Sequence, residues 1–72
     1  MRPPTVDGKT VRRLRVERLI TCAELARRSG VAYSFLRDIE AGLKGASDIT
    51  AHKLATALDV PVEQLQAKAG AA

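Results

Sequence analysis

The chain has 72 residues, which is long enough for one domain and too short for a deep catalytic cleft. It carries 12 Lys or Arg against 8 Asp or Glu, a formal net charge of +4 at pH 7. The excess is uneven, because residues 1–45 hold ten basic and five acidic side chains, and residues 46–72 hold two and three. A basic half attracts nucleic acid, anionic membranes or acidic proteins without distinguishing among them, although solubility alone also explains a charged surface.

Residue usage excludes several classes of protein. A single cysteine and a single histidine exclude an internal disulfide and argue against a Cys-based metal cluster. The sequence has neither clustered carboxylates nor a Gly-rich phosphate loop, so we expect no enzyme, no metal and no other cofactor. No apolar run approaches the ~20 residues of a membrane span, and the N-terminus lacks the apolar core of a signal peptide. We therefore expect a cytoplasmic protein without membrane association.

The first part of the chain predicts an arm followed by a helix. Residues 1–8 contain a Pro-Pro and an Asp-Gly pair, which favour a flexible N-terminal arm. A helix is expected over residues 9–19. Arg15 lies on the apolar side of this helix, and a cation near the core edge needs a partner. The expected buried stripe comprises Val11, Leu14 and Leu19.

Residues 21–42 predict two short helices joined by a tight turn. The hydroxyl of Thr21 can accept from the backbone N–H of Glu24, and the Glu24 carboxylate can reach back to the N–H of Thr21, as in a capping box. The first helix should end at Gly30, and the second should run over residues 33–41 before another glycine. Two helices and a short Gly-containing turn predict a helix-turn-helix, a motif whose second helix enters the DNA major groove.

The second of these helices has two different faces. At about 100° per residue, the large apolar side chains gather on one face. These are Phe35, Leu36 and Ile39. The opposite face has hydrogen-bonding side chains and no large aliphatic group. Most amphipathic helices have only a solvated outer face, but the helix-turn-helix spacing and the basic surroundings favour DNA binding.

Two further helices complete the pattern. An apolar stripe at helical spacing predicts a helix over residues 49–58. His52 lies off this stripe without a ligand partner one turn away, so it is expected to face solvent. A short helix over residues 62–67, after a proline suited to a first helical position, has Val62 and Leu65 as its apolar pair. Residues 68–72 are expected to be a frayed tail.

The segments VRRLRVER, ITCAELARRSGVAYSFLRDIEAG and HKLATALDVPVEQL together resemble the Cro/CI-type (lambda repressor-like, XRE) helix-turn-helix family of phage repressors and bacterial regulators. The resemblance implies an all-α fold: a compact five-helix bundle over residues 9–67, with the helix-turn-helix at its second and third helices. It implies a sequence-specific binder of double-stranded DNA that regulates transcription, in most cases as a repressor. An alternative is a protein-interaction module, such as an antitoxin or adaptor, with DNA binding secondary.

The resemblance also implies the partners and the site. Family members usually bind twofold-symmetric operators as homodimers, and the favoured dimer surface here is the last helix and the tail, with Val62 and Leu65. Such a protein would be associated with the nucleoid when bound to DNA. The positions that typically face base edges are Tyr33, Ser34, Arg37 and Asp38. The positions placed to contact phosphates are Thr21, Cys22, Arg27 and Lys44. Arg15 and Glu40 occupy the positions of a structural ion pair between the first and third helices.

Three residues depart from the family pattern. Cys22 stands where a phosphate-binding glutamine is common, which removes the expected amide contact, and we expect an inert boundary thiol there. Ala32 stands where Ser or Thr often caps the third helix, a loss of ~1 kcal/mol of capping. Phe35 stands where a small polar residue is common, and it should pack inward, because an exposed Phe35 would indicate a protein partner.

Overall fold

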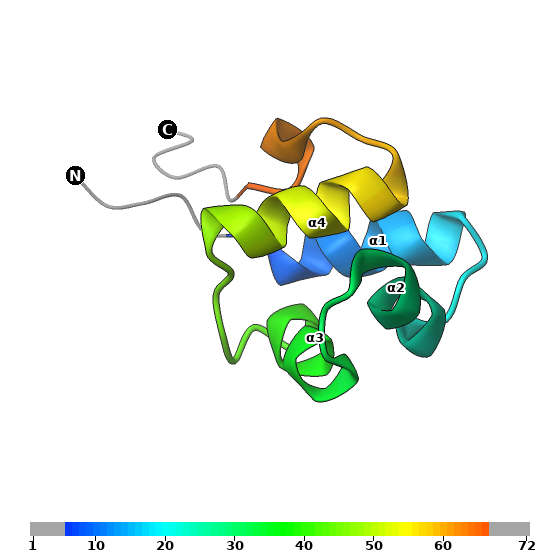
Figure 1. Ribbon diagram of the computed structural model, residues 1–72, viewed down its shortest axis with the longest axis horizontal. Helices are drawn as coiled ribbons and strands as arrows, with labels where there is room; N and C mark the ends of the chain where they lie inside the picture. The colour runs from blue at the N-terminus through cyan, green and yellow to red at the C-terminus, as the bar shows by residue number, and fades with distance from the viewer. Residues whose placement is uncertain (1–5, 67–72) are drawn as a thin grey trace.

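A computed structural model describes residues 6–66 (Figure 1). Over this range the chain forms four α-helices and one 3₁₀ turn: α1 (Gly8–Glu17), α2 (Cys22–Ser29), α3 (Tyr33–Glu40), α4 (Asp48–Leu58) and η1 (Val62–Gln64). The all-α prediction is confirmed. The expected fifth α-helix is instead a single 3₁₀ turn after Pro61. The tail predicted at residues 68–72 lies outside the described range.

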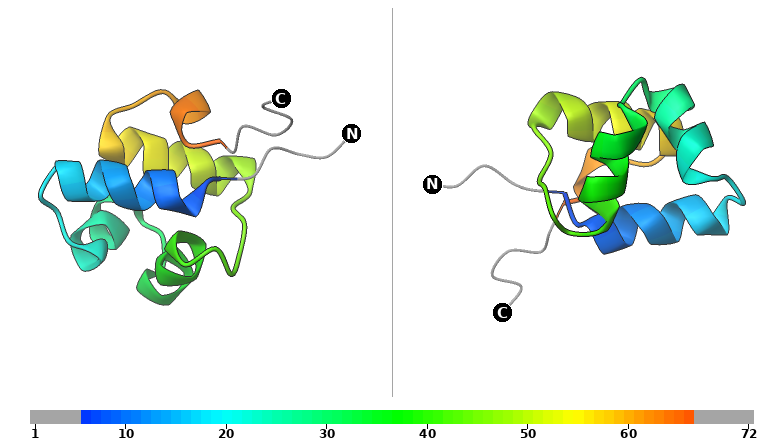
Figure 2. Two further views of the ribbon diagram at one scale, coloured as in Figure 1. Left: turned by 180° about the vertical axis from the view of Figure 1, so that it is seen from behind. Right: turned by 90° about the horizontal axis from the view of Figure 1, so that it is seen from below.

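α1 and α4 lie side by side, with α2 and α3 on one side of this pair and η1 on the other (Figures 1 and 2). Their facing side chains form one aliphatic core. The largest fully buried side chains are Val11, Leu25, Leu36, Ile39, Leu54, Leu58 and Leu65. Every helix contributes side chains to this core. The burial of apolar surface therefore holds α3 in one orientation relative to the other helices. No helix within residues 6–66 is long and apolar enough to cross a membrane.

Three of the helices end in the same hydrogen-bonded motif. After α1, α3 and α4 the chain turns through a left-handed residue, respectively Leu19 (φ 58°), Gly42 (φ 80°) and Asp59 (φ 59°). In each case the left-handed residue donates to the carbonyl three residues earlier, and the next residue donates to the carbonyl five residues earlier. This is the Schellman motif. The prediction that Leu19 is buried was wrong: its side chain is 92% exposed, because α1 ends at Glu17 and the chain turns away from the core.

The N-terminal boundary also differs from the prediction. Val6, placed by the prediction in a flexible arm, is buried and forms an isolated antiparallel bridge with Gln66. The backbone N–H of Asp7 donates to the carbonyl of Leu65 at 2.6 Å, and the Asp7 carboxylate accepts from the Thr10 hydroxyl at 2.7 Å. The two ends of the described chain are therefore joined, and the packed domain includes Val6, which lies three residues before the predicted start. Residues 1–5 of the expected arm lie outside the described range.

Gly8 is the first residue of α1, and the absence of a side chain is what lets it approach α3. A Cβ atom at this position would lie 1.9 Å from the backbone oxygen of Ile39. The sequence pattern treats this glycine as a sign of a loop. In the folded protein it is the point where α1 passes over the last turn of α3.

Candidate nucleic-acid interface

The turn between α2 and α3 is built from local hydrogen bonds. The Thr21 hydroxyl accepts from the backbone N–H of Glu24 at 3.0 Å and caps α2. α2 ends at Gly30, whose φ of 76° suits a residue without a side chain. Ala32 precedes α3 and makes no side-chain cap, although its carbonyl accepts the first helical hydrogen bond. α3 then begins at Tyr33, as the sequence predicts.

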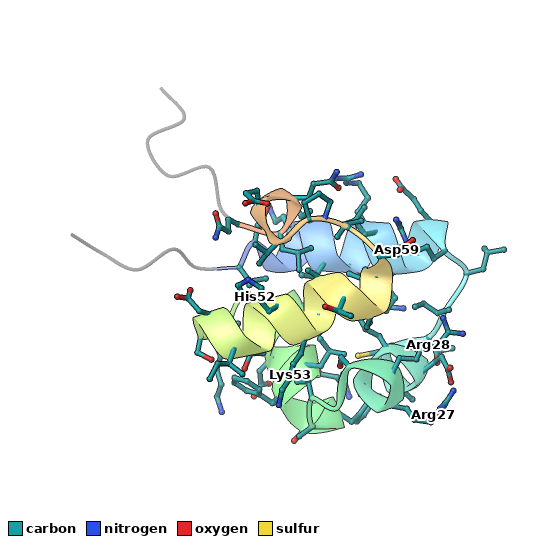
Figure 3. All side chains as sticks on the ribbon, turned by 45° about the horizontal axis from the view of Figure 1, so that its top comes forward. Arg27, Arg28, His52, Lys53 and Asp59 are labelled. Carbon is teal, nitrogen blue, oxygen red and sulfur yellow. The ribbon has the colours of Figure 1, made fainter. Side chains whose placement is uncertain are left out.

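Only half of the expected capping box is present. The Glu24 carboxylate does not bond to the Thr21 N–H; it pairs with Arg27 and Arg28 on its own helix, at 3.1 Å from Arg27 Nε and 2.6 Å from Arg28 Nε. A further bond joins Arg27 Nη2 to Glu24. These bonds, from Arg27 first and then Arg28, lower the pKa of Glu24 to about 2. Figure 3 shows both arginines extending from α2 at the surface. A phosphate at Arg27 would therefore share the guanidinium with Glu24.

α3 buries one face and exposes the other. Leu36 and Ile39 are fully buried, and Phe35 packs against the core while partly exposed. The Lys44 ammonium lies 5.8 Å from the centroid of the Phe35 ring, so the loop after α3 covers part of it. On the exposed side is a shallow depression, here called the α3 hollow. It is lined by Tyr33, Ser34, Arg37, Asp38, Ala41 and Leu43.

The α3 hollow brings together all four residues predicted to face base edges. Arg37 Cζ lies 5.9 Å from the Tyr33 ring centroid, so the ring supports the guanidinium. Within residues 6–66 Arg37 forms no salt bridge, and its donors remain available. Asp38 Oδ2 lies 3.5 Å from Lys44 Nζ. One residue predicted to contact a base and another predicted to contact a phosphate thus form a pair with each other.

α3 is tied to α1 by the ion pair between Arg15 and Glu40. Arg15 Nε donates to Glu40 Oε2 at 2.8 Å, and Arg15 Nη2 donates to Oε1 at 3.0 Å. A third bond runs from Arg15 Nη1 to the backbone oxygen of Ile20 at 3.0 Å. The two side chains are 14% and 9% exposed. The hydrogen bond to Glu40 raises the pKa of Arg15, so the guanidinium stays charged at any physiological pH.

A second depression beside the ion pair adds a residue that the sequence analysis missed. Arg12 of α1 lies there with Cys22 at the start of α2 and Arg37 of α3. Burial raises the pKa of the Cys22 thiol, which is therefore protonated at neutral pH. The sequence offered one indication that Arg12 lies near α3: it precedes Arg15 by one helical turn, and Arg15 was expected to pair with α3. Across the described part of the chain, no group of three or more potential metal ligands comes together.

A small helical bundle whose third helix presents a polar, partly basic face beside a tight turn defines a helix-turn-helix protein. The chain belongs to the Helix-turn-helix family, whose model matches residues 11–65. The resemblance to Cro/CI-type regulators is thereby confirmed.

Three similar proteins are informative. The HTH-type transcriptional repressor RghR of Bacillus subtilis (strain 168) is 44% identical over 64 residues, covering 88% of this chain and 47% of that protein, so the chain spans about half the length of this relative. The restriction-modification controller protein C.AhdI from Aeromonas hydrophila is 33% identical with a TM-score of 0.77, covering 79% of this chain and 86% of that one. SinR, a master regulator for biofilm formation solved in complex with DNA, is 35% identical with a TM-score of 0.75, covering 78% and 90%.

Proposed function

We propose that this protein binds double-stranded DNA sequence-specifically, with α3 in the major groove, and regulates transcription as a repressor by occluding its operator. The observation that carries the proposal is the exposed face of α3, where Arg37 lies free of ion pairs among the described residues. The DNA complex of SinR and the repressor RghR support it as similar proteins. Such a protein acts in the cytoplasm, at the nucleoid when it is bound to DNA.

The residues differ in what they contribute to recognition. Arg37 has a planar fork that bonds guanine O6 and N7 together, worth ~1–3 kcal/mol of discrimination. Ser34 serves several bases and specifies little, and Tyr33 supports Arg37 and reaches a thymine methyl or a phosphate. Asp38 can accept from cytosine N4, but Lys44 already partly neutralises its carboxylate, so it acts mainly by disfavouring wrong registers.

Phosphate contacts hold the domain in position without specifying sequence. We assign them to Lys44, Arg27 and Thr21, with Arg12 added because it lies beside Arg37. The backbone N–H groups at the start of α2 also point outward from a helix N-terminus, which favours an anion. The protonated thiol of Cys22 is a weak donor and contributes little to this set.

We further propose that the protein binds as a homodimer on an operator of twofold symmetry, with half-sites about one helical turn apart. Of the dimer surface favoured by the sequence, the last helix and the tail, the structure describes the apolar pair Val62 and Leu65, and this pair offers little exposed apolar area. Leu65 is fully buried inside the domain, and Val62 packs partly against the core. The tail that belongs to the same surface lies outside the described residues.

The test is selection from a random duplex library at near-physiological salt, followed by binding to the enriched sequence. Arg37→Ala should relax the choice of one base pair, whereas Arg27→Ala should weaken all sequences alike and lower the salt slope by about one unit. Lys53→Ala removes one charge from the exposed face of α4 and should change neither. Equal effects of the Arg37 and Arg27 variants on specific and random DNA would refute the assigned roles.

Protein interaction as the main function is the alternative. Two features would favour it, an exposed Phe35 and an apolar surface on the last helix. Phe35 packs against the core and Leu65 is buried, so neither feature supports it. Weak duplex binding with no enriched sequence would restore this alternative.

A further inference from the structure

The residue after the left-handed turn of each Schellman motif is apolar in this chain: Ile20 after α1, Leu43 after α3 and Val60 after α4. In this motif such a side chain usually packs on an apolar residue in the last turn of its helix. Ile20 and Val60 follow the rule and pack against the core. Leu43 does not, because it is 74% exposed.

The reason lies in the last turn of α3. The residues that would contact Leu43 in the motif are Asp38 and Arg37, which are both polar. The backbone of Leu43 is nevertheless held, since its N–H donates to the Asp38 carbonyl at 2.9 Å and Gly42 donates to Ile39 at 3.1 Å. A leucine on a hydrogen-bonded backbone therefore keeps most of its side chain in water.

Leu43 does not stand alone on this surface. It lines the α3 hollow together with Ala41 and with polar side chains that include Ser34 and Arg37. The hollow thus has a polar part, suited to hydrogen bonds with base edges, and a small apolar part at the C-terminal end of α3. Among the groups that base pairs expose in the major groove, the C5-methyl of thymine is the apolar one.

We propose that Leu43 and Ala41 form a subsite for the C5-methyl group of a thymine, and that Leu43 is a specificity-determining residue. The proposal rests on the proposed function, since it requires α3 to lie in the major groove. The proposed ligand of the exposed Leu43 side chain is a thymine beside the base pair contacted by Arg37. A second copy of the chain or another protein would also cover Leu43, but without sensitivity to a single methyl group.

The experiment removes the methyl group from the DNA. In the selected operator each thymine is replaced in turn by deoxyuridine, which keeps its pairing and its O4 acceptor. Affinity is measured by fluorescence anisotropy for the full chain and for Leu43→Ala. For the unaltered chain, a single deoxyuridine at the contacted position should weaken binding about 4-fold, the effect of one buried methyl group. Leu43→Ala should bind the thymine operator about 4-fold or more weakly and should lose the deoxyuridine effect.

Ile49→Ala is the matched control, because Ile49 is an aliphatic side chain of α4 that is 70% exposed and outside the α3 hollow. It should leave both operators unaffected. Thermal melting of Leu43→Ala should match the unaltered chain, since the side chain makes no core contact. Any loss of affinity is then attributable to the interface.

Each contrary result overturns a definite statement. If Leu43→Ala keeps the full deoxyuridine effect, or weakens the thymine and deoxyuridine operators equally, Leu43 does not contact the methyl group. If the chain binds an operator in which no thymine is methyl-sensitive, the subsite fails while the proposed function stands. If the chain binds no duplex above random background, the proposed function fails and the subsite fails with it.

Discussion

Glu40→Gln should destabilise the fold strongly while leaving its shape almost unchanged. Glutamine has the size of glutamate, but it places an NH₂ group against the Arg15 guanidinium in place of one acceptor oxygen. The variant thus loses one of the two bonds, at 2.8 and 3.0 Å, and leaves a cation that is 14% exposed without a counter-charge. The remaining bond from Arg15 to the Ile20 carbonyl offsets part of the loss.

The magnitude follows from this geometry. Removing one partner of a buried pair costs ~3–5 kcal/mol, and the surviving bond to Ile20 places Glu40→Gln near the lower end, at about 3 kcal/mol. A domain of 72 residues has a total stability of about 4–11 kcal/mol at ~0.05–0.15 kcal/mol per residue. At ~4–8 °C per kcal/mol for a domain of this size, the melting temperature should fall by about 12–24 °C.

Urea and thermal unfolding followed by circular dichroism measure this change, and Glu17→Gln is the matched control. Glu17 pairs with Arg13 on the surface of α1, with side chains 54% and 60% exposed, and its loss should cost under ~1 kcal/mol. Replacing Arg15 and Glu40 together by methionine should destabilise less than Glu40→Gln, because no unpaired charge is left. If the Glu40 and Glu17 variants melt at the same temperature, the ion pair does not stabilise the fold as argued.

Three other changes test the same structure. Gly8→Ala should lower stability by ~1–3 kcal/mol, because the new Cβ would lie 1.9 Å from the Ile39 oxygen and α1 must shift; an unchanged urea midpoint would contradict this contact. Ala32→Ser should raise stability by ~0.5–1 kcal/mol by capping α3, and a lower melting temperature would show that the hydroxyl does not reach the helix. The pKa of Glu24 is about 2 in the folded chain against an ordinary 4.5, so its stabilising effect is present above pH 4.5 and is lost as pH falls toward 2. The difference in melting temperature between the unaltered chain and Glu24→Gln should therefore shrink over that range, and a constant difference would show that these ion pairs do not form in solution.

Sequence reasoning was most successful where structure depends on neighbouring residues. α2 begins and ends where Thr21 and Gly30 predict, because a cap and a left-handed glycine act within one turn of helix. The inward packing of Phe35 also follows from helical spacing. The roles of the residues on the exposed face of α3 are different, because they came from family resemblance and stay predictions until DNA binding is measured.

The errors occur where a residue's role depends on distant parts of the chain. Gly8 was taken as a loop glycine, but its contact is Ile39, and Val6 was placed in an arm although it pairs with Gln66. Leu19 fitted an apolar stripe only on the assumption that α1 continued past Glu17. Helical periodicity carries no information about where one element meets another, so these positions could not be found by spacing.

The sequence by itself determined the class of this protein: short amphipathic helices with a capped α2, a glycine turn and a basic first half. These features depend on hydrogen bonds and side-chain spacing over a few residues, which local sequence encodes directly. Only the tertiary structure decided which exposed groups share a surface. Packing of α1 against α3 brings Arg12 and Arg37 to one depression, and the polar last turn of α3 leaves Leu43 largely exposed. The positions of side chains from different elements depend on how the whole core is filled.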